Sequence, residues 1–233
     1  SGDGDCCQEG MIGDGYPDCE DQMWGCDLTC YDNDGGDCDD PTMPSSVIIL
    51  NNVENVVIKD LKIEGGAGSN AGNYPQVGGG INSVNSNSEL ENIILSENVA
   101  MFGGGMMSVT SNTVINNVVI DNNYSYNTGG GIKNLMSSVT MENSEIKNNY
   151  AAMGGGIWIG ENSSSLILSG VTIKDNDANY RGGGLYSARN GSGIVFEGEN
   201  RSSIYSNTAS LGNDLYSISP LDVILDTFTV TTP

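Results

Sequence analysis

The sequence contains no histidine, and only eight Lys and Arg stand against 30 Asp and Glu, for a formal net charge of −22 over 233 residues. Without histidine, a histidine base and an imidazole-ligated metal are both excluded. Because phosphate groups are bound mainly by Lys and Arg, the charge argues against nucleic acid, anionic membranes and acidic polymers as partners. No run of 18 apolar residues is present, so we expect no membrane span.

Cysteine is missing after residue 38, and all six cysteines fall in the first 40 residues: Cys6, Cys7, Cys19, Cys26, Cys30 and Cys38. The same 40 residues hold 13 Asp and Glu and neither Lys nor Arg. An even number of cysteines in a short segment with few apolar residues predicts a disulfide-stapled module and an oxidising, extracellular setting. Six cysteines allow 15 pairings, and the sequence leaves the connectivity open.

The acidic residues of this segment are candidate metal ligands. Asp32, Asp34 and Asp37 flank Gly35 and Gly36, where the backbone can turn tightly enough for carboxylates on both sides to meet one ion. Oxygen ligands without histidine favour Ca²⁺. The alternative is an acidic, disulfide-tied knot that binds no ion. In either case we expect a structural role for the segment.

Three motifs in this segment, Ile-Gly-Asp-Gly-Tyr at 12–16, Asp18-Cys19 and Asp-Gly-Gly-Asp-Cys at 34–38, resemble the Notch-type cysteine repeat over residues 6–40. The resemblance implies an LNR-like Ca²⁺-binding module with three disulfides, in which Asp34 and Asp37 are ligands and Asp18 and Asp27 are their companions. Adjacent Cys6 and Cys7, and Pro17 in place of a usual cysteine, depart from the family's pattern. Pro41 and Pro44 predict a linker, so we place one domain at 1–44 and a second at 45–233.

The second domain is built on a repeat of about 26 residues. Five glycine triplets end at Gly80, Gly105, Gly131, Gly156 and Gly184, which lie 25, 26, 25 and 28 residues apart. An aliphatic residue followed three places later by asparagine recurs in phase with them. The asparagines are Asn98, Asn123, Asn149, Asn176 and Asn207, and each lies five or six residues before the next glycine run. Two motifs at a fixed offset over five cycles indicate a repeat protein.

Each repeat contains three short runs that favour strands, separated by turn-forming Gly, Asn, Ser and Asp. Three stacked strands per period predict an all-β fold, a right-handed single-stranded parallel β-helix of about six to seven coils. Equivalent residues then lie above one another, so the five asparagines are expected to form a structural ladder of amides at a corner. Ile81, Met106, Ile132, Ile157 and Leu185 are expected to form an aliphatic stack.

The Gly-Gly-Gly-Ile and Ile-x-x-Asn motifs resemble the repeats of polymorphic outer membrane proteins over residues 46–216, although those are usually written Gly-Gly-Ala-Ile and Phe-x-x-Asn. The resemblance implies a β-helical passenger domain on a cell surface.

The repeats offer little for catalysis, and we predict no catalytic and no cofactor-binding residue other than the Ca²⁺ ligands. A polysaccharide lyase that uses Ca²⁺ is the enzyme alternative, with Lys174, Asp175, Asp177 and Arg181 as its best local cluster. Trp158 is expected to point outward, where it could contact a glycan or be covered by Tyr and Met side chains.

These patterns predict an extracellular structural or interaction protein at the cell surface: an adhesin, a matrix protein or a filament subunit. Self-association, or cell-surface and matrix partners, are expected, with head-to-tail pairing through residues 222–230. The alternative is a carbohydrate-binding module that takes glycans.

Overall fold

A computed structural model describes residues 45–71, 74–160, 164–188 and 193–218, and the structural statements below concern these residues. The six cysteines and the five candidate Ca²⁺ ligands of the predicted N-terminal module lie outside them, as do residues 222–230. The described residues form 26 strands and no helix, so no helix among them could cross a membrane.

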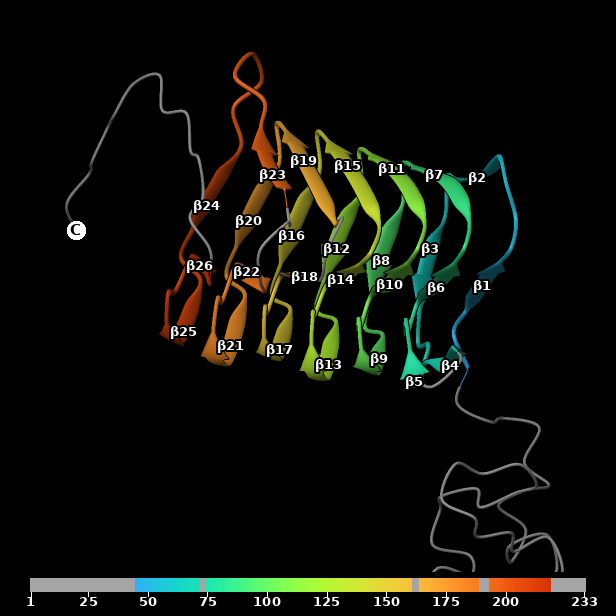
Figure 1. Cartoon of the computed structure of the whole chain (residues 1–233), viewed down its shortest axis with the longest axis horizontal. Coiled ribbons are helices and arrows are strands. Elements are labelled where there is room, and N and C mark those ends of the chain that lie inside the picture. Colours follow the sequence, from blue (N-terminus) through green and yellow to red (C-terminus); the bar gives the residue numbers. More distant parts are fainter. Residues whose placement is uncertain (1–44, 72–73, 161–163, 189–192, 219–233) are drawn as a thin grey trace, which may run out of the picture. The chain divides into compact units, whose positions relative to one another are not determined.

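Sheets A and B each run the length of the solenoid (Figure 1). Sheet A consists, in order, of β1 (Ile48–Asn51), β6 (Ile81–Val84), β10 (Met106–Val109), β14 (Ile132–Leu135), β18 (Ile157–Gly160), β22 (Leu185–Ala188) and β26 (Leu215–Ser217). Sheet B consists of β2 (Val56–Lys59), β7 (Asn87–Glu91), β11 (Asn112–Asn116), β15 (Ser138–Glu142), β19 (Ser165–Ser169) and β23 (Gly193–Phe196).

Sheets C and D complete each turn of the chain. Sheet C consists of β3 (Lys62–Glu64), β8 (Ile94–Ser96), β12 (Val119–Asp121), β16 (Glu145–Lys147), β20 (Thr172–Lys174) and β24 (Ser203–Tyr205). Sheet D consists of β4 (Ser69–Ala71), β5 (Tyr74–Val77), β9 (Val99–Phe102), β13 (Tyr124–Thr128), β17 (Tyr150–Met153), β21 (Asp177–Arg181) and β25 (Thr208–Leu211). The chain visits the four sheets in the order A, B, C, D and then begins the next turn.

The parallel β-helix predicted from the repeat is confirmed, with one difference in the number of strands per turn. Every turn has four strands, so the expectation of three is wrong: the stretch between each ladder asparagine and the next glycine run also pairs, as sheet D. Five regular turns run from β6 to β25. Strands β1, β2, β3 and β5 form a less regular first turn, in which β5 pairs with β9 only at Val77 and Phe102, and β26 begins a further turn; the expected six to seven coils include these ends. The pair β4 and β5 is antiparallel and closes one end of sheet D.

The core lies between the sheets and is built from inward-facing aliphatic residues stacked in register. The predicted stack of Ile81, Met106, Ile132, Ile157 and Leu185 is present, and each of its members is fully buried. A second stack consists of Leu95, Ile120, Ile146, Ile173 and Ile204. Since a buried large apolar side chain contributes roughly 1.5–3 kcal/mol, each added turn extends the same stabilisation.

Between β6 and β22, sheet A is largely buried on its outer face as well, whereas Ile49 of β1 is 53% exposed. Val77, Met107 and Leu135 form a second apolar cluster, with Phe102, Val109 and Trp158 packed against it. Val77 and Phe102 are the last residues of sheet D strands, immediately before a glycine run. The reversal at the glycines therefore brings the end of sheet D into contact with the outer face of sheet A.

The corners between sheets turn through residues with positive φ. From A to B these are Asn52, Asn55, Asn85, Thr110 and Met136; from B to C, Asp60, Asn92, Asn117, Asn143 and Gly170; from C to D, Gly65, Gly68, Glu97, Asn122, Asn148, Asp175 and Ser206; from D to A, Gly78, Gly103, Gly129, Gly154, Gly182 and Gly212. Asn and Asp adopt this conformation more readily than other residues with a side chain, which explains their abundance at three of the corners.

Candidate functional site

The five repeated asparagines form one hydrogen-bonded column at the corner between sheets C and D, and none is more than 3% exposed. Asn149 is representative. Its backbone N–H donates to Oδ1 of Asn176 at 3.0 Å, and its Nδ2 donates to the same oxygen at 2.9 Å. Its own Oδ1 accepts from the backbone N–H and Nδ2 of Asn123 at 2.9 and 3.0 Å. Each buried amide is thus satisfied by its neighbours, and the column joins successive turns.

The column has two different ends. In the first turn Gly66 occupies the asparagine position, and its backbone N–H donates to Oδ1 of Asn98 at 3.0 Å. In the last, Asp214 replaces the third glycine of the triplet. Its Oδ1 accepts from the backbone N–H and Nδ2 of Asn207 at 3.1 and 2.9 Å. A backbone amide therefore begins the column and a carboxylate ends it.

A second polar column, which sequence reasoning missed, lies at the corner between sheets A and B. The backbone N–H of Ser86 donates to Oγ of Ser111 at 3.0 Å, and that of Ser111 donates to Oγ of Ser137 at 2.9 Å. Each of these hydroxyls donates in turn to the carbonyl two residues earlier, at 2.7 to 2.8 Å. Residues 86, 111 and 137 have the period of the glycine triplets, and this spacing was the signal.

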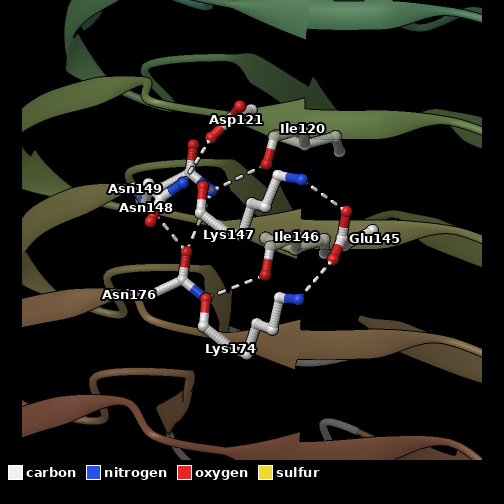
Figure 2. Close-up of polar contacts among 9 residues, drawn as sticks. All are labelled: Ile120, Asp121, Glu145, Ile146, Lys147, Asn148, Asn149, Lys174 and Asn176. Carbon is white, nitrogen blue, oxygen red and sulfur yellow. Dashed lines mark hydrogen bonds and ion pairs between the residues drawn. The ribbon is translucent and has the colours of Figure 1, made fainter.

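Two lysines and one glutamate pair on the outer face of sheet C (Figure 2). Glu145 Oε2 lies 2.7 Å from Nζ of Lys147, and Oε1 lies 2.9 Å from Nζ of Lys174 in the next turn. The hydrogen bonds from Lys147 and Lys174 lower the pKa of Glu145, and the bond from Glu145 raises the pKa of Lys174. All three side chains are 27% exposed, so this is a surface network that links two turns.

The residues considered for catalysis have separate partners. Lys174 pairs with Glu145, whereas Asp177 accepts a hydrogen bond from Oγ1 of Thr208 at 2.8 Å. The guanidinium of Arg181 lies 5.2 Å from the ring centroid of Tyr216. Asp175 is a corner residue with φ of 55°. Within the described ranges, no group of three or more acidic or cysteine residues could hold a metal ion.

Trp158 lies on the outer face of sheet A, as expected, but it is half-buried there. Its ring covers Gly160, where an added Cβ would lie 2.3 Å from the ring. Nζ of Lys133, which is only 6% exposed, lies 4.8 Å from the centroid of Trp158 and 3.9 Å from that of Phe102. Tyr186 in the next turn stacks on Trp158 with centroids 6.4 Å apart. Much of the indole therefore contacts protein, and its role in glycan contact remains a prediction.

Tyrosines on the outer face of sheet D are more exposed. Tyr124 and Tyr150 are in register on adjacent strands, and their rings stack with centroids 4.9 Å apart and planes at 15°. Tyr126 meets Tyr124 edge-on, also at 4.9 Å, and remains 60% exposed; Tyr180 is 62% exposed. Partial burial, together with Tyr150, raises the pKa of the Tyr124 hydroxyl, which is therefore a neutral donor at pH 7. Tyr126 and Tyr180 are the most exposed aromatic side chains among the described residues.

Comparison of the chain with family models, curated proteins and solved structures finds no match. The function is therefore argued from the geometry above.

Proposed function

We propose that the protein is an extracellular structural and interaction protein: an adhesin, a matrix protein or a filament subunit. The observation that supports this most is the parallel pairing of four sheets through successive turns of the solenoid. Inward positions serve the core, and corner positions serve the polar columns, so the outward positions of sheets B, C and D remain for contacts with partners. A stack in which each turn supports the next suits a stiff scaffold.

The partners of the charged residues favour this role over that of a polysaccharide lyase. A lyase needs a base and acidic Ca²⁺ ligands at one place. Lys174, Asp177 and Arg181 instead contact Glu145, Thr208 and Tyr216 respectively. The first two contacts join neighbouring strands of one sheet, and the third joins the end of sheet D to sheet A, which is a structural use of charge.

Head-to-tail assembly is the form of self-association that we propose. Among the described residues, β23, β24, β25 and β26 each end a sheet, and β1, β2 and β3 do so at the other end. Strand edges of this kind can accept a strand from another chain. Residues 222–230 are proposed as that strand, added to the first turn of the next subunit. At the first turn, the antiparallel β4 occupies the edge of sheet D. Among the described residues, the edges of sheets A, B and C are therefore the ones that we propose for this pairing.

The resemblance to polymorphic outer membrane protein repeats supports the surface location and the right-handed winding that we propose. The resemblance to the Notch-type repeat supports a disulfide-rich N-terminal module in which Asp18, Asp27, Asp32, Asp34 and Asp37 supply Ca²⁺ ligands. Calorimetric titration with Ca²⁺ tests the module. Loss of the binding heat in Asp34→Asn and Asp37→Asn is expected, and an unchanged heat contradicts the ligand assignment.

Negative-stain electron microscopy of the full chain tests the assembly, with a chain truncated after Ser219 as the control. We expect filaments whose length increases with concentration from the full chain and single particles from the truncated one. Single particles from both chains, or filaments from both, would contradict the pairing through residues 222–230. Labelling of intact producing cells with a membrane-impermeant reagent tests the surface location, which fails if only lysed cells are labelled.

A further inference from the structure

Sheet D differs from the other sheets in having strands of alternating length. β13 and β21 have five residues, whereas β9, β17 and β25 have four. The register accordingly shifts along β13 and along β21, against the neighbour on either side. Such an insertion is a β-bulge, which bends a strand locally and redirects a side chain.

Both bulges present the same pair of residue types. The bulge of β13 consists of Tyr126 and Asn127, and that of β21 consists of Asn179 and Tyr180; each pair lies opposite one residue of β17. The two tyrosines are the most exposed large hydrophobic side chains among the described residues, at 60% and 62%. Strand β17 lies between them without a bulge and carries the small Ala152 at the corresponding place. Two exposed tyrosines thus lie on either side of β17, which has only a small side chain at this position.

The two bulges are held in place by hydroxyl groups. Oγ of Ser125 lies 3.0 Å from the carbonyl oxygen of Met101 in the neighbouring strand β9 and 3.1 Å from that of Thr128, which follows the first bulge. Oγ of Ser210 donates to the carbonyl of Asn179 in the second at 2.7 Å. The ring of Tyr126 is also supported edge-on by Tyr124. Because these side chains and strands are already ordered, such a surface loses less conformational entropy on binding a ligand than a flexible surface does.

The chemistry of this surface suits a neutral sugar polymer. Exposed aromatic faces pack against the apolar faces of sugar rings, while the amides of Asn127 and Asn179 and the tyrosine hydroxyls can bond to sugar hydroxyls. Since β13 and β21 are two strand spacings apart, about 9.6 Å, the tyrosines span more than one pyranose ring. A net charge of −22 disfavours anionic polymers.

We propose that the outer face of sheet D, between Tyr126 and Tyr180, binds a neutral polysaccharide. This deepens the proposed interaction function and rests on it. Electrophoresis of the full chain in native gels containing galactomannan, xyloglucan or hydroxyethylcellulose tests the proposal, with polygalacturonate as the anionic comparison. We expect at least one neutral polymer to retard the protein, and Tyr126→Ala and Tyr180→Ala each to weaken the apparent affinity about tenfold.

Tyr205→Ala is the matched control, because Tyr205 is 46% exposed on sheet C and lies away from the bulges. It should retain wild-type retardation, and Tyr126→Phe should remain within about threefold because the ring face is kept. Circular dichroism verifies that each variant is folded. The proposal is overturned if no neutral polymer retards the protein, if only polygalacturonate does, or if Tyr205→Ala loses as much affinity as Tyr126→Ala. Electron microscopy of the same samples shows whether the scaffold still assembles, so a failed ligand and a failed scaffold are distinguished.

Discussion

Two corners of the solenoid turn the chain through the same backbone conformation with different residues. From sheet D to sheet A, Gly103 has φ of 65°, and from sheet C to sheet D, Asn148 has φ of 52°. A Cβ on Gly103 would lie 2.4 Å from the carbonyl oxygen of Met106, whereas the side chain of Asn148 is exposed. The C-to-D corner accordingly also accepts Glu97 and Ser206. The difference shows that the residues a corner can accept depend on the space available for a side chain, and not on the φ angle alone.

The largest expected effect comes from adding a methyl group at the crowded corner. In Gly104→Ala the new Cβ would lie 2.4 Å from the carbonyl oxygen of Tyr124 and 2.5 Å from that of Gly130. Because both neighbours are backbone of the next turn, they cannot move aside without disturbing the pairing. We expect a loss of about 3–5 kcal/mol in the free energy of unfolding, measured by urea denaturation. Gly193→Ala, which meets nothing within 4 Å, is the control. Equal midpoints for the two variants would refute the steric account.

The next effect separates two adjacent asparagines at the other corner. Asn149→Ala leaves the Asn123 amide and the carbonyls of Ile120 and Lys147 without their partner, at a cost of about 3 kcal/mol. Asn148→Ala loses only an exposed bond to Asp121 and the tolerance of Asn for positive φ, about 1 kcal/mol. Thermal unfolding of both variants compares them, and a larger loss for Asn148→Ala would mean that the buried column contributes less than its geometry suggests.

A smaller effect of opposite sign is expected at the corner between sheets A and B. Met136 has φ of 50° there and is 42% exposed, while Asn85 occupies the equivalent position two turns earlier with φ of 46°. Met136→Asn should raise the free energy of unfolding by about 0.5–1 kcal/mol, because Asn adopts this conformation with less strain. Asn85→Met should lower it by a similar amount. Urea midpoints that move in the same direction in both variants would show that φ preference does not decide this corner.

The smallest effect concerns the outer face of sheet C, at Glu145. Its pKa is lowered, so its ionised form adds stability that is lost as pH falls through the lowered value; the pKa of Lys174 is raised, so that contribution is lost as pH rises through the raised value. Glu145→Gln should therefore cost no more than about 1 kcal/mol between roughly pH 5 and pH 10, and less beyond either limit. Unfolding midpoints from pH 3 to pH 11 give the profile. A constant difference across that range would contradict the ionic origin.

The same comparison explains which parts of the fold were predictable. Packing leaves no room for a side chain at glycines such as Gly104, and the hydrogen bonds at Asn149 require an amide. Both residue types therefore recur in the sequence and reveal the period. Sheet D was missed because its strands vary in length and composition, from Val-Ala-Met-Phe in β9 to Asp-Ala-Asn-Tyr-Arg in β21. The interval from each ladder asparagine to the next glycine run, which is five, six, five, six and five residues, contained the bulges.

The candidate site was less predictable than the fold. Trp158 was expected outward, and it does face away from the core, yet the fold of sheet D over sheet A covers part of it. That contact depends on the reversal at the glycines, which a strand pattern does not describe. The exposed tyrosines were visible as residues, but their alignment depends on which strands bulge. Local sequence determines the ladders, whereas the outer surfaces depend on how consecutive turns differ.

The carboxylate of Asp214 bears on how such a protein can change in length. Every asparagine in the column accepts hydrogen bonds from the turn before it and donates hydrogen bonds to the turn after it. A duplicated unit of about 26 residues between Asn98 and Asn207 would therefore make the same hydrogen bonds as its neighbours. The side chain of Asp214 only accepts hydrogen bonds, because an ionised carboxylate has no proton to donate. Duplication of a repeat can therefore lengthen the protein upstream of Asp214, and Asp214 ends the hydrogen-bonded column of amides.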